Sequence, residues 1–340
     1  MTPARFNALA KKFATLKIAV VGDFCLDRYL EIDPAKQEVS IETNLPVHNV
    51  VRVRSQPGGA GTILNNLAAL GVGEIYPVGF CGEDGEGFEL RLALQARPGA
   101  NLRHFVTTAL RRTFTYCKPL LMHPDRPPQE LNRLDSKNWT PTPALVQDRI
   151  ADAAVKLAGQ MDAFILLDQV DVPDTGVMTA KVLDTINDVI NKRPDLLIVA
   201  DSRRGLRGYP PVCLKMNHAE LSALTGCPGK ATPDESKPVV SALAHKQGRN
   251  VFVTLSERGI LGASPDGTVE HVPALPVRGP IDIVGAGDAV TANLTASLAA
   301  GATVREAMEI AMAAASIVIH QLGTTGTAGV PDLRSLFEAG

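Results

Sequence analysis

The chain has 340 residues, and its 34 basic and 36 acidic side chains leave a formal net charge of −2. Because 45% of the residues are hydrophobic and 4% are aromatic, the composition is typical of an α/β domain with a well-buried parallel sheet. The near-neutral charge, without long basic runs, gives no electrostatic footprint for nucleic acid or for an anionic membrane, so we expect neither partner.

The five cysteines are scattered along the chain and form no C-x-x-C pair. This distribution argues against a disulfide framework and against a zinc site. Residues 1–17 lack the apolar stretch of a secretory signal, and no apolar run approaches the length of a membrane span. We therefore expect a cytoplasmic protein.

The first predicted element is a short β-branched run at residues 17–23, K-I-A-V-V-G-D. It predicts a central parallel strand whose carboxyl end opens a ligand site. A dinucleotide-binding fold would have G-x-G-x-x-G here, and the chain has G-D-F-C-L-D-R instead, which counts against a Rossmann oxidoreductase. Asp23 and Asp27 follow this strand, where they either reach ligand hydroxyls or are solvated loop carboxylates.

Two extended segments interrupt the core pattern and predict one lid sheet assembled from both. Arg111, Arg112 and Lys118 belong to the second segment, where they either meet a substrate phosphate or form a solvated face. We expect the lid to comprise 28–54 and 102–135, and the nucleotide- and substrate-binding core to comprise 1–27, 55–101 and 136–340.

A glycine-rich turn at residues 57–61, P-G-G-A-G, leads into an apolar helix that ends at Gly71. Gly58 and Gly59 would let a ligand approach the backbone closely. Tight packing of a helix on a strand needs the same glycines, so both interpretations remain.

After residue 141, helices and strands alternate regularly, which predicts a doubly wound, mostly parallel sheet flanked by helices. Asp168, Asp201 and Asn217 each fall at the carboxyl end of a predicted strand, where open parallel sheets bind ligands. Asn217 and Glu220 bracket the start of a helix. Glu220 either holds a hydrated cation through water or compensates the helix dipole.

The stretch at residues 281–301 begins I-D-I-V-G-A-G-D and continues as an alanine-rich helical pattern. Gly285 and Gly287 leave the backbone unobstructed at the start of that helix, so free N–H groups and its positive end would converge on an anion. Asp288 beside such a site suits a proton acceptor, which suggests phosphoryl transfer. The alternative is a plain helix N-terminus at which Asp288 compensates the dipole.

Taken in order, these motifs resemble the ribokinase or PfkB family of carbohydrate kinases across nearly the whole chain. The matching pieces are G-D-F-C-L-D (22–27), P-G-G-A-G (57–61), N-x-A-x-L-G (66–71), V-G-F-C-G-E-D (78–84), M-N-H-A-E (216–220), V-T-L-S-E-R-G (253–259) and D-I-V-G-A-G-D (282–288). The resemblance implies a ribokinase-like α/β fold with a small β lid, and a kinase that uses ATP and Mg²⁺.

The resemblance also implies roles for individual residues. Asp288 is the catalytic base, and the anion hole for the transferred phosphate comprises Gly285, Ala286 and Gly287. The nucleotide and Mg²⁺ region comprises Asn217, Glu220 (Mg²⁺ through water), Thr254, Ser256 and Gly259. The sugar side comprises Asp23, Asp27, Gly58, Gly59, Thr62, Asn66 and Arg112. A monovalent cation site, for K⁺, comprises Asp282, Val284 and Gly323.

Within the family, the chain is similar to the kinase domain of bifunctional heptose 7-phosphate kinase and ADP-heptose synthase proteins. The likeness is carried by V-V-G-D-x-x-L-D-R-Y (20–29), S-x-E (40–42), R-L-D (133–135) and Q-L-G-T (321–324). The sequence ends soon after the kinase-like part, so we expect no nucleotidyltransferase half in it. The departures are Thr62 for a usual Asn, Q-V-D-V-P-D after Asp168 for a usual Tyr and Lys-Gly pattern, and Ala289 for a common Thr.

The resemblance implies a sugar or sugar-phosphate acceptor, with heptose 7-phosphate as one candidate. Two alternatives remain: a catalytically weak sugar or nucleotide sensor on the same fold, and a kinase for another small alcohol such as a nucleoside. Exposed strand edges are normally covered, and related kinases often pair their lids, so we expect a homodimer through the β lid.

Overall fold

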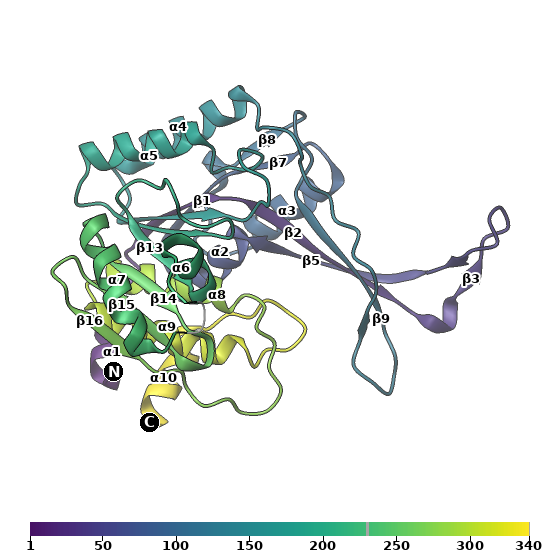
Figure 1. Ribbon diagram of the computed structural model, residues 1–340. Coiled ribbons are helices and arrows are strands. Elements are labelled where there is room, and N and C mark those ends of the chain that lie inside the picture. The colour runs from purple at the N-terminus through teal and green to yellow at the C-terminus, as the bar shows by residue number, and fades with distance from the viewer. Residues whose placement is uncertain (229–230, 340) are drawn as a thin grey trace.

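The computed structural model describes residues 1–228 and 231–339, which form an α/β core with a long β lid projecting from one side (Figure 1). Within these residues, the core sheet has eight strands in the order β16-β15-β14-β13-β12-β11-β1-β6. The parallel strands are β6 (Glu74–Val78), β1 (Lys17–Gly22), β11 (Ala163–Asp168), β12 (Leu197–Ser202), β13 (Cys213–Asn217) and β14 (Val251–Thr254). Two antiparallel strands, β15 (Ile260–Ala263) and β16 (Val269–Val272), complete one edge. The predicted mostly parallel sheet is confirmed.

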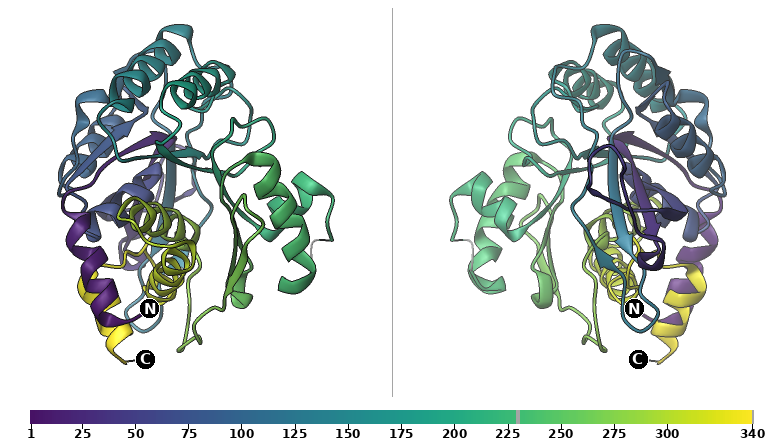
Figure 2. Two further views of the ribbon diagram at one scale, coloured as in Figure 1. Left: turned by 90° about the vertical axis from the view of Figure 1, so that its left-hand side faces the viewer. Right: turned by 90° about the vertical axis from the view of Figure 1, so that its right-hand side faces the viewer.

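Helices cover both faces of this sheet (Figure 2), so its strands are buried on two sides. In β1, Ala19 and Val21 pack into one hydrophobic cluster, whereas Ile18 and Val20 pack into another. The first cluster includes side chains of α4 (Ala144–Ala158), α5 (Ala180–Lys192), α6 (His218–Thr225) and α7 (Pro233–Gln247). The second includes side chains of α1 (Pro3–Phe13), α2 (Ala60–Ala69), α3 (Gly85–Gln95), α8 (Ala286–Ala299), α9 (Val304–Val318) and α10 (Val330–Ala339).

The lid is built on β2, which follows β1 after a single residue and leaves the core. Its sheet has the order β10-β9-β2-β5, with β2 antiparallel to β5 and parallel to β9. These strands are β2 (Phe24–Ile32), β5 (Val50–Gly59), β9 (Thr115–Leu121) and β10 (Gln129–Glu130). The lid projects from the core as an arm, and a small hairpin of β3 (Glu38–Val39) and β4 (Pro46–Val47) lies toward the far end of this arm (Figure 1). A separate parallel pair consists of β7 (Phe80–Gly82) and β8 (Val106–Thr108).

The strand register of the lid determines which side chains share its inner face. Residues that are paired on neighbouring strands point to the same side of a sheet. The register gives three such rows: Gly58 with Cys25; Gln56, Asp27 and Tyr116; and Arg54, Tyr29 and Lys118. Gln56 donates a hydrogen bond to Thr325 of the core (2.7 Å), so this face is turned toward the core.

Within the described part of the chain, no helix combines the length and the apolar character needed to cross a membrane.

Candidate active site

The N-terminus of α8 presents free backbone amides, as expected for an anion site. Gly285 is the N-cap residue and has φ +82°, a conformation that glycine adopts without strain. Ala286 donates its amide hydrogen to the carbonyl of Ile283 (3.2 Å). Within the described residues, the amides of Gly287 and Asp288 have no hydrogen-bond acceptor and no side chain caps the helix. The two free amide donors and the positive end of the α8 dipole therefore both favour binding of an anion at this point.

A buried ion pair lies beside this loop. The Nζ of Lys215 is 2.7 Å from Oδ2 of Asp201, and the hydroxyl of Thr291 in α8 donates to the same oxygen (2.9 Å). A Cβ added at Gly287 would lie 3.2 Å from the Lys215 Nζ, so the ammonium group lies next to the anion loop. Lys215 is absent from the residues that the motifs assign. Its only sequence signal is a lysine inside an otherwise apolar, buried strand.

Asp288 lies in the first turn of α8, next to the open amides. Burial, followed by the negative charge of Asp201, raises the pKa of Asp288 to about 7, while Lys215 acts to lower it. A carboxyl group with a pKa near neutrality is suited to accept a proton at physiological pH. The structure thus places the expected base and the expected anion site together.

Asn217 and Glu220 form a capping box at the start of α6. The amide of Asn217 donates to Oε2 of Glu220 (2.7 Å), and the amide of Glu220 donates to Oδ1 of Asn217 (2.9 Å). Burial is the main cause that raises the pKa of Glu220. Within the described residues, no group of three acidic, histidine or cysteine side chains could hold a metal ion. Glu220 could hold a hydrated Mg²⁺ ion here through water.

The remaining predicted nucleotide residues lie at the neighbouring strand end. Thr254 pairs in register with Asn217, and the turn that follows contains Ser256 (φ +55°) and Gly259 (φ +91°). A Cβ at Gly259 would lie 2.0 Å from the carbonyl oxygen of Val272, so only glycine fits there. The carboxyl ends of β13 and β14 thus bring these residues together.

The residues expected at a monovalent cation site come from two loops. Asp282 accepts a hydrogen bond from the amide of Val284 (3.0 Å), and its own amide donates to the carbonyl of Ile319 (2.8 Å). Gly323, with φ +71°, lies in the segment that follows Ile319. The structure therefore places the 282–285 turn against the chain near Ile319.

On the sugar side, Asp27 and Lys118 form a buried pair across the lid sheet, with Nζ 3.2 Å from Oδ1. Burial is the largest cause that raises the pKa of Asp27, and Lys118 acts to lower it. A Cβ at Gly58 would lie 2.7 Å from Oδ2 of Asp27, so the glycine turn packs on this carboxylate. Burial is the largest cause that raises the pKa of the Cys25 thiol, and the negative charges of Asp27 and Asp288 act in the same direction.

Asp23 has a different environment from Asp27. Its carboxylate accepts hydrogen bonds from the backbone amides of Gln169 (2.8 Å), Val170 (3.3 Å) and Val177 (2.6 Å). Burial and the neighbouring Asp168 raise the pKa of Asp23. Its carboxylate therefore holds the loop after β11 in place. The sequence-based interpretations of Asp23, as a ligand contact or as a solvated carboxylate, did not include this structural role.

Thr62 and Asn66 lie inside α2, buried from solvent. The Nδ2 of Asn66 donates to the carbonyl of Thr62 (3.0 Å). Within the described residues, the Thr62 hydroxyl and Oδ1 of Asn66 are buried without a hydrogen-bond partner. Thr62 lies close to the α8 loop, since its Cγ2 is 3.5 Å from a Cβ added at Gly285. The structure thus brings Thr62 next to the anion loop, although it leaves the hydroxyl covered.

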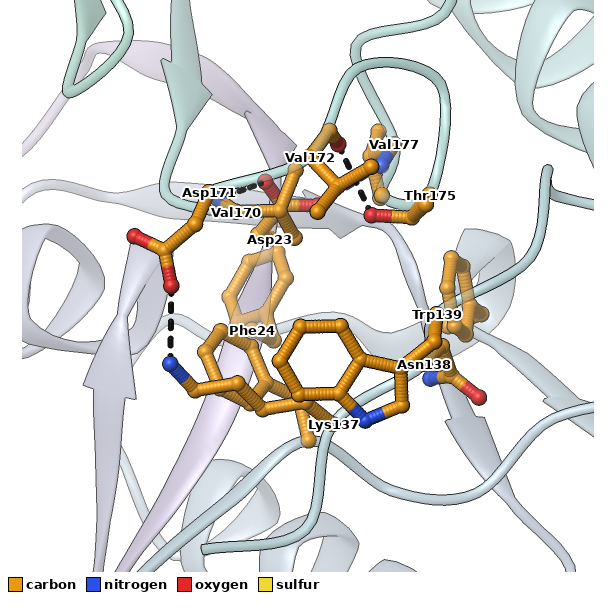
Figure 3. Close-up of a pocket in the computed structure, with 13 residues that line it drawn as sticks. Asp23, Phe24, Lys137, Asn138, Trp139, Val170, Asp171, Val172, Thr175 and Val177 are labelled. Atoms are coloured by element: carbon orange, nitrogen blue, oxygen red, sulfur yellow. Dashed lines mark hydrogen bonds and ion pairs between the residues drawn. The ribbon is translucent and has the colours of Figure 1, made fainter.

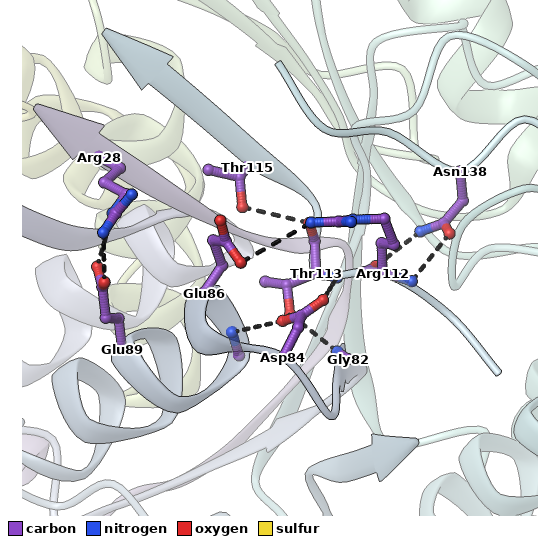
Figure 4. Close-up of polar contacts among 10 residues, drawn as sticks. Arg28, Gly82, Asp84, Glu86, Glu89, Arg112, Thr113, Thr115 and Asn138 are labelled. Carbon is purple, nitrogen blue, oxygen red and sulfur yellow. Dashed lines mark hydrogen bonds and ion pairs between the residues drawn. The ribbon is translucent and has the colours of Figure 1, made fainter. Parts of the chain in front are cut away.

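Arg112 contacts Glu86 and Asn138. Its guanidinium points toward Glu86 of α3 (3.9 Å), and its backbone pairs with the side chain of Asn138, as Figure 4 shows. Its neighbour Arg111 is buried and donates to the hydroxyl and carbonyl of Thr140 (both 2.9 Å). The buried guanidinium of Arg111 thus has partners in the core, whereas the guanidinium of Arg112 is largely exposed and makes one long ion pair, so its role at the acceptor side stays a prediction.

Comparisons with known proteins show the family to which the chain belongs. Residues 15–331 match the model of the pfkB family carbohydrate kinases. The bifunctional protein HldE of Azorhizobium caulinodans is 32% identical over 310 residues, which are 90% of this chain and 61% of that protein. HldE of Rhodopseudomonas palustris is 31% identical over 323 residues, 94% of this chain and 63% of that protein. The chain thus spans about three fifths of the length of these curated relatives.

Solved structures show the same fold. A structure of Arabidopsis thaliana ribokinase complexed with ribose and ATP superposes with a TM-score of 0.63 at 20% identity, covering 95% of this chain and 98% of that one. Escherichia coli phosphofructokinase-2 in complex with fructose-6-phosphate gives a TM-score of 0.66 at 17% identity, with the same coverage of 95% and 98%. The expected ribokinase-like fold is confirmed.

Proposed function

The chain belongs to the pfkB family of carbohydrate kinases, and from this premise we propose that it transfers the γ-phosphoryl group of ATP to a hydroxyl group of a sugar or sugar phosphate. Heptose 7-phosphate is the leading acceptor, because the sequence motifs and the HldE relatives point in the same direction. The observation that carries the proposal is the open N-terminus of α8, where the free amides of Gly287 and Asp288 lie next to the ammonium group of Lys215.

In the proposed reaction, the carboxylate of Asp288 accepts the proton of the acceptor hydroxyl as that oxygen forms a bond to the γ-phosphorus. The bond from the γ-phosphorus to the bridging oxygen breaks, and ADP leaves with that electron pair. The amides of Gly287 and Asp288 and the ammonium group of Lys215 stabilise the negative charge of the transferred group. Mg²⁺, when bound, neutralises charge on the nucleotide phosphates, and Glu220 would hold it through water.

The lid supplies the acceptor side of the reaction. Asp27 and Lys118 offer an acceptor and a donor for sugar hydroxyls in a largely water-free setting. Gln56 ties this face to the core, because its side chain hydrogen-bonds the hydroxyls of Thr325 (2.7 Å) and Thr324 (3.2 Å). Closure of the lid would exclude water and limit hydrolysis of ATP.

A coupled ADP-release assay tests the proposal. The protein is supplied with Mg·ATP and K⁺ and with a panel of free sugars, sugar phosphates including heptose 7-phosphate, and nucleosides. We expect turnover with a sugar or sugar phosphate. Protein that binds ATP yet releases no ADP with any member would contradict the proposed kinase and favour a sensor, and turnover with nucleosides alone would reassign the acceptor.

We further propose a homodimer through the lid. The arm exposes a run of apolar side chains that water does not favour: Val39, Ile41, Leu45, Val50, Val51 and Val53. A monomeric mass in light scattering at micromolar concentration would contradict the dimer. We assign the reaction to the cytoplasm, since the five free cysteines fit a reducing compartment that contains ATP.

A further inference from the structure

The lid sheet has an outer face, opposite the face that carries the acceptor residues. Successive side chains of a strand point to opposite faces. Because Asp27 and Gln56 lie on the inner face, their chain neighbours Arg28 and Ser55 lie on the outer face, where they are paired in the register of β2 and β5. A group that holds this outer pair therefore also fixes the backbone from which Asp27 and Gln56 project.

Helix α3 holds the outer pair with one carboxylate. Oε1 of Glu89 accepts a hydrogen bond from Nη2 of Arg28 (2.8 Å), and Oε2 accepts from Nε of Arg28 (3.1 Å) and from the hydroxyl of Ser55 (2.5 Å). Figure 4 shows Arg28 and Glu89 facing one another. We call these three residues the Glu89 clamp. A bidentate pair of guanidinium and carboxylate groups is directional, so Glu89 fixes the orientation of β2 as well as its distance from α3.

The start of α3 is tied to a third strand of the lid. Asp84 is the N-cap residue of α3, and its Oδ1 accepts from the amide of Gly87 (2.8 Å) and from the hydroxyl of Thr113 (2.6 Å). Its Oδ2 accepts from the amide of Thr113 (2.9 Å), as Figure 4 shows. Thr113 is buried just before β9, the strand that carries Lys118, the partner of Asp27. Helix α3 is thus bonded to the chain of β2, β5 and β9.

The inner side of the lid, next to the core, is held by apolar contacts. Cys25, Phe114 and Tyr116 form a hydrophobic cluster against which Val170 packs. Val170 belongs to the loop after β11, which the carboxylate of Asp23 holds through backbone amides. Apolar contacts are not directional, so this loop limits the movement of the lid without fixing its orientation.

The charged contacts on the inner side are weaker than the Glu89 clamp. Lys137 and Arg203 lie near Tyr116, and each makes one contact to Asp171, at 2.8 and 3.7 Å. Figure 3 shows Lys137 and Asp171 facing one another at the rim of a pocket of about 20 Å³, room for about one water molecule. The Asp171 side chain is 46% exposed, whereas that of Glu89 is 28% exposed and accepts three hydrogen bonds. Exposed single ion pairs contribute little, so the orientation of the lid depends mainly on α3.

We propose that Glu89 is a positioning residue of the acceptor side: through the Glu89 clamp, α3 sets the position of Asp27 and Gln56, and the lid and α3 move as one body. The inference rests on the proposed function, because it names a residue that controls acceptor binding at the same site. Without the clamp, the lid populates orientations in which Asp27 and Gln56 are misplaced. The apparent affinity for the acceptor then falls with the fraction of competent protein. A saturating acceptor restores the competent orientation, so kcat is retained.

Steady-state kinetics of two graded substitutions test the inference. Glu89→Gln keeps a carbonyl acceptor for Arg28 or Ser55 and removes the charge, whereas Glu89→Ala removes both. With an acceptor that supports turnover, we expect KM for that acceptor to rise about threefold to tenfold in Glu89→Gln and about tenfold to thirtyfold in Glu89→Ala. Both kcat and KM for ATP should stay within about twofold. Adding Arg28→Met to Glu89→Ala should raise KM little further, because both changes break the same pair.

The matched control is Glu306→Gln. Glu306 of α9 makes the same kind of bidentate pair with Arg5 of α1 (2.8 and 2.9 Å), between two helices of the core. Chemical denaturation should show a similar loss of stability in Glu306→Gln and in Glu89→Gln. A rise in acceptor KM that is confined to Glu89→Gln and Glu89→Ala therefore reports positioning. An equal rise in Glu306→Gln, or no rise in Glu89→Ala, overturns the proposal.

Hydrogen exchange separates this inference from the proposed kinase activity, because it requires no acceptor. We expect the amides of β2 and β5 around Arg28 and Ser55 to exchange at least about fivefold faster in Glu89→Ala than in the wild type, together with those of α3. Glu306→Gln should leave them unchanged. Absence of ADP release with every acceptor contradicts the kinase, and the exchange rates then decide the clamp: equal rates in Glu89→Ala and the wild type overturn it. Faster exchange with an unchanged acceptor KM shows a purely structural contact and overturns the positioning role.

Discussion

The two sides of the proposed active site, the donor side for ATP and the acceptor side for the sugar, are built in different ways. The donor side consists of strand ends and a helix N-terminus of the core, where Gly285 fixes the backbone and the Lys215–Asp201 pair is buried. The acceptor side consists of lid side chains and loops, and its charged groups at Lys137, Arg203 and Asp171 are partly exposed. A backbone-defined site is nearly fixed before substrate arrives, whereas a side-chain-defined site can be altered by single substitutions. We therefore expect chemistry to depend on the donor side and substrate choice to depend on the acceptor side.

The largest effect should come from Asp288→Asn. The amide has nearly the shape of the carboxylate and cannot accept the hydroxyl proton, so kcat should fall by about two to four powers of ten. The affinity for ATP should be nearly unchanged, because the open amides of Gly287 and Asp288 remain. Single-turnover kinetics and calorimetric titration with ATP measure the two quantities. Turnover equal to the wild type would remove Asp288 as the base.

Removing the charge of Lys215 should produce the next largest effect. Lys215→Met deletes the ammonium group beside the anion loop, and we expect kcat/KM to fall about a hundredfold. It should also change the pH profile. Asp288 must be deprotonated to act as a base, so the wild-type rate should decline as the pH falls below about 7, the value to which burial raises its pKa. Because Lys215 acts to lower that pKa, this acid limb should move to higher pH in Lys215→Met.

Lys215→Arg is the matched control for that experiment, since it keeps the positive charge beside Asp201. We expect its acid limb to stay near that of the wild type, although its kcat/KM falls because the guanidinium group is larger. An acid limb that is the same in Lys215→Met and in the wild type would show that Lys215 does not set the charge state of Asp288.

The same contrast explains how far the sequence predicts the structure. The alternation of apolar strands and helices predicts the doubly wound core, because burial on both faces imposes a local pattern. The loop at Gly285 is predicted equally well, since a glycine pair before an alanine-rich helix permits few backbone geometries. These features depend on residues that are close together along the chain.

The unpredicted features depend on contacts between distant segments. Lys215 gains its role from Asp201 on the neighbouring strand and from Gly287 on α8. Tyr116 meets Arg133 and Arg203 only because the lid folds over the loop after β12. No local periodicity predicts such contacts, so the sequence named Asp27 and Lys118 for the acceptor side but did not predict that Tyr116 and Arg203 would lie together.

A smaller effect is expected on the acceptor side from Asp27→Asn. The change weakens hydrogen bonds to the sugar, so KM for the acceptor should rise about tenfold while KM for ATP stays constant. It also leaves Lys118 buried without its partner carboxylate, which should lower the free energy of unfolding by about 3 kcal/mol. Adding Lys118→Met to Asp27→Asn should restore stability in chemical denaturation without restoring KM. If both quantities recovered together, the pair would be structural and would not bind the acceptor.

The smallest effect should come from the contact that joins the two sides. Gln56→Ala removes the hydrogen bonds between the lid and the hydroxyls of Thr324 and Thr325. Each such part-buried bond contributes about 0.5 kcal/mol, so we expect the loss of both to raise KM for the acceptor about threefold to fivefold, together with faster ATP hydrolysis in the absence of acceptor. The control is Asn49→Ala, which removes a hydrogen bond of the same length (2.7 Å) from Asn49 to the carbonyl of Lys36, within the arm. A matching rise in ATP hydrolysis in both variants would show that general loosening of the lid, rather than its contact with the core, controls access of water to the site.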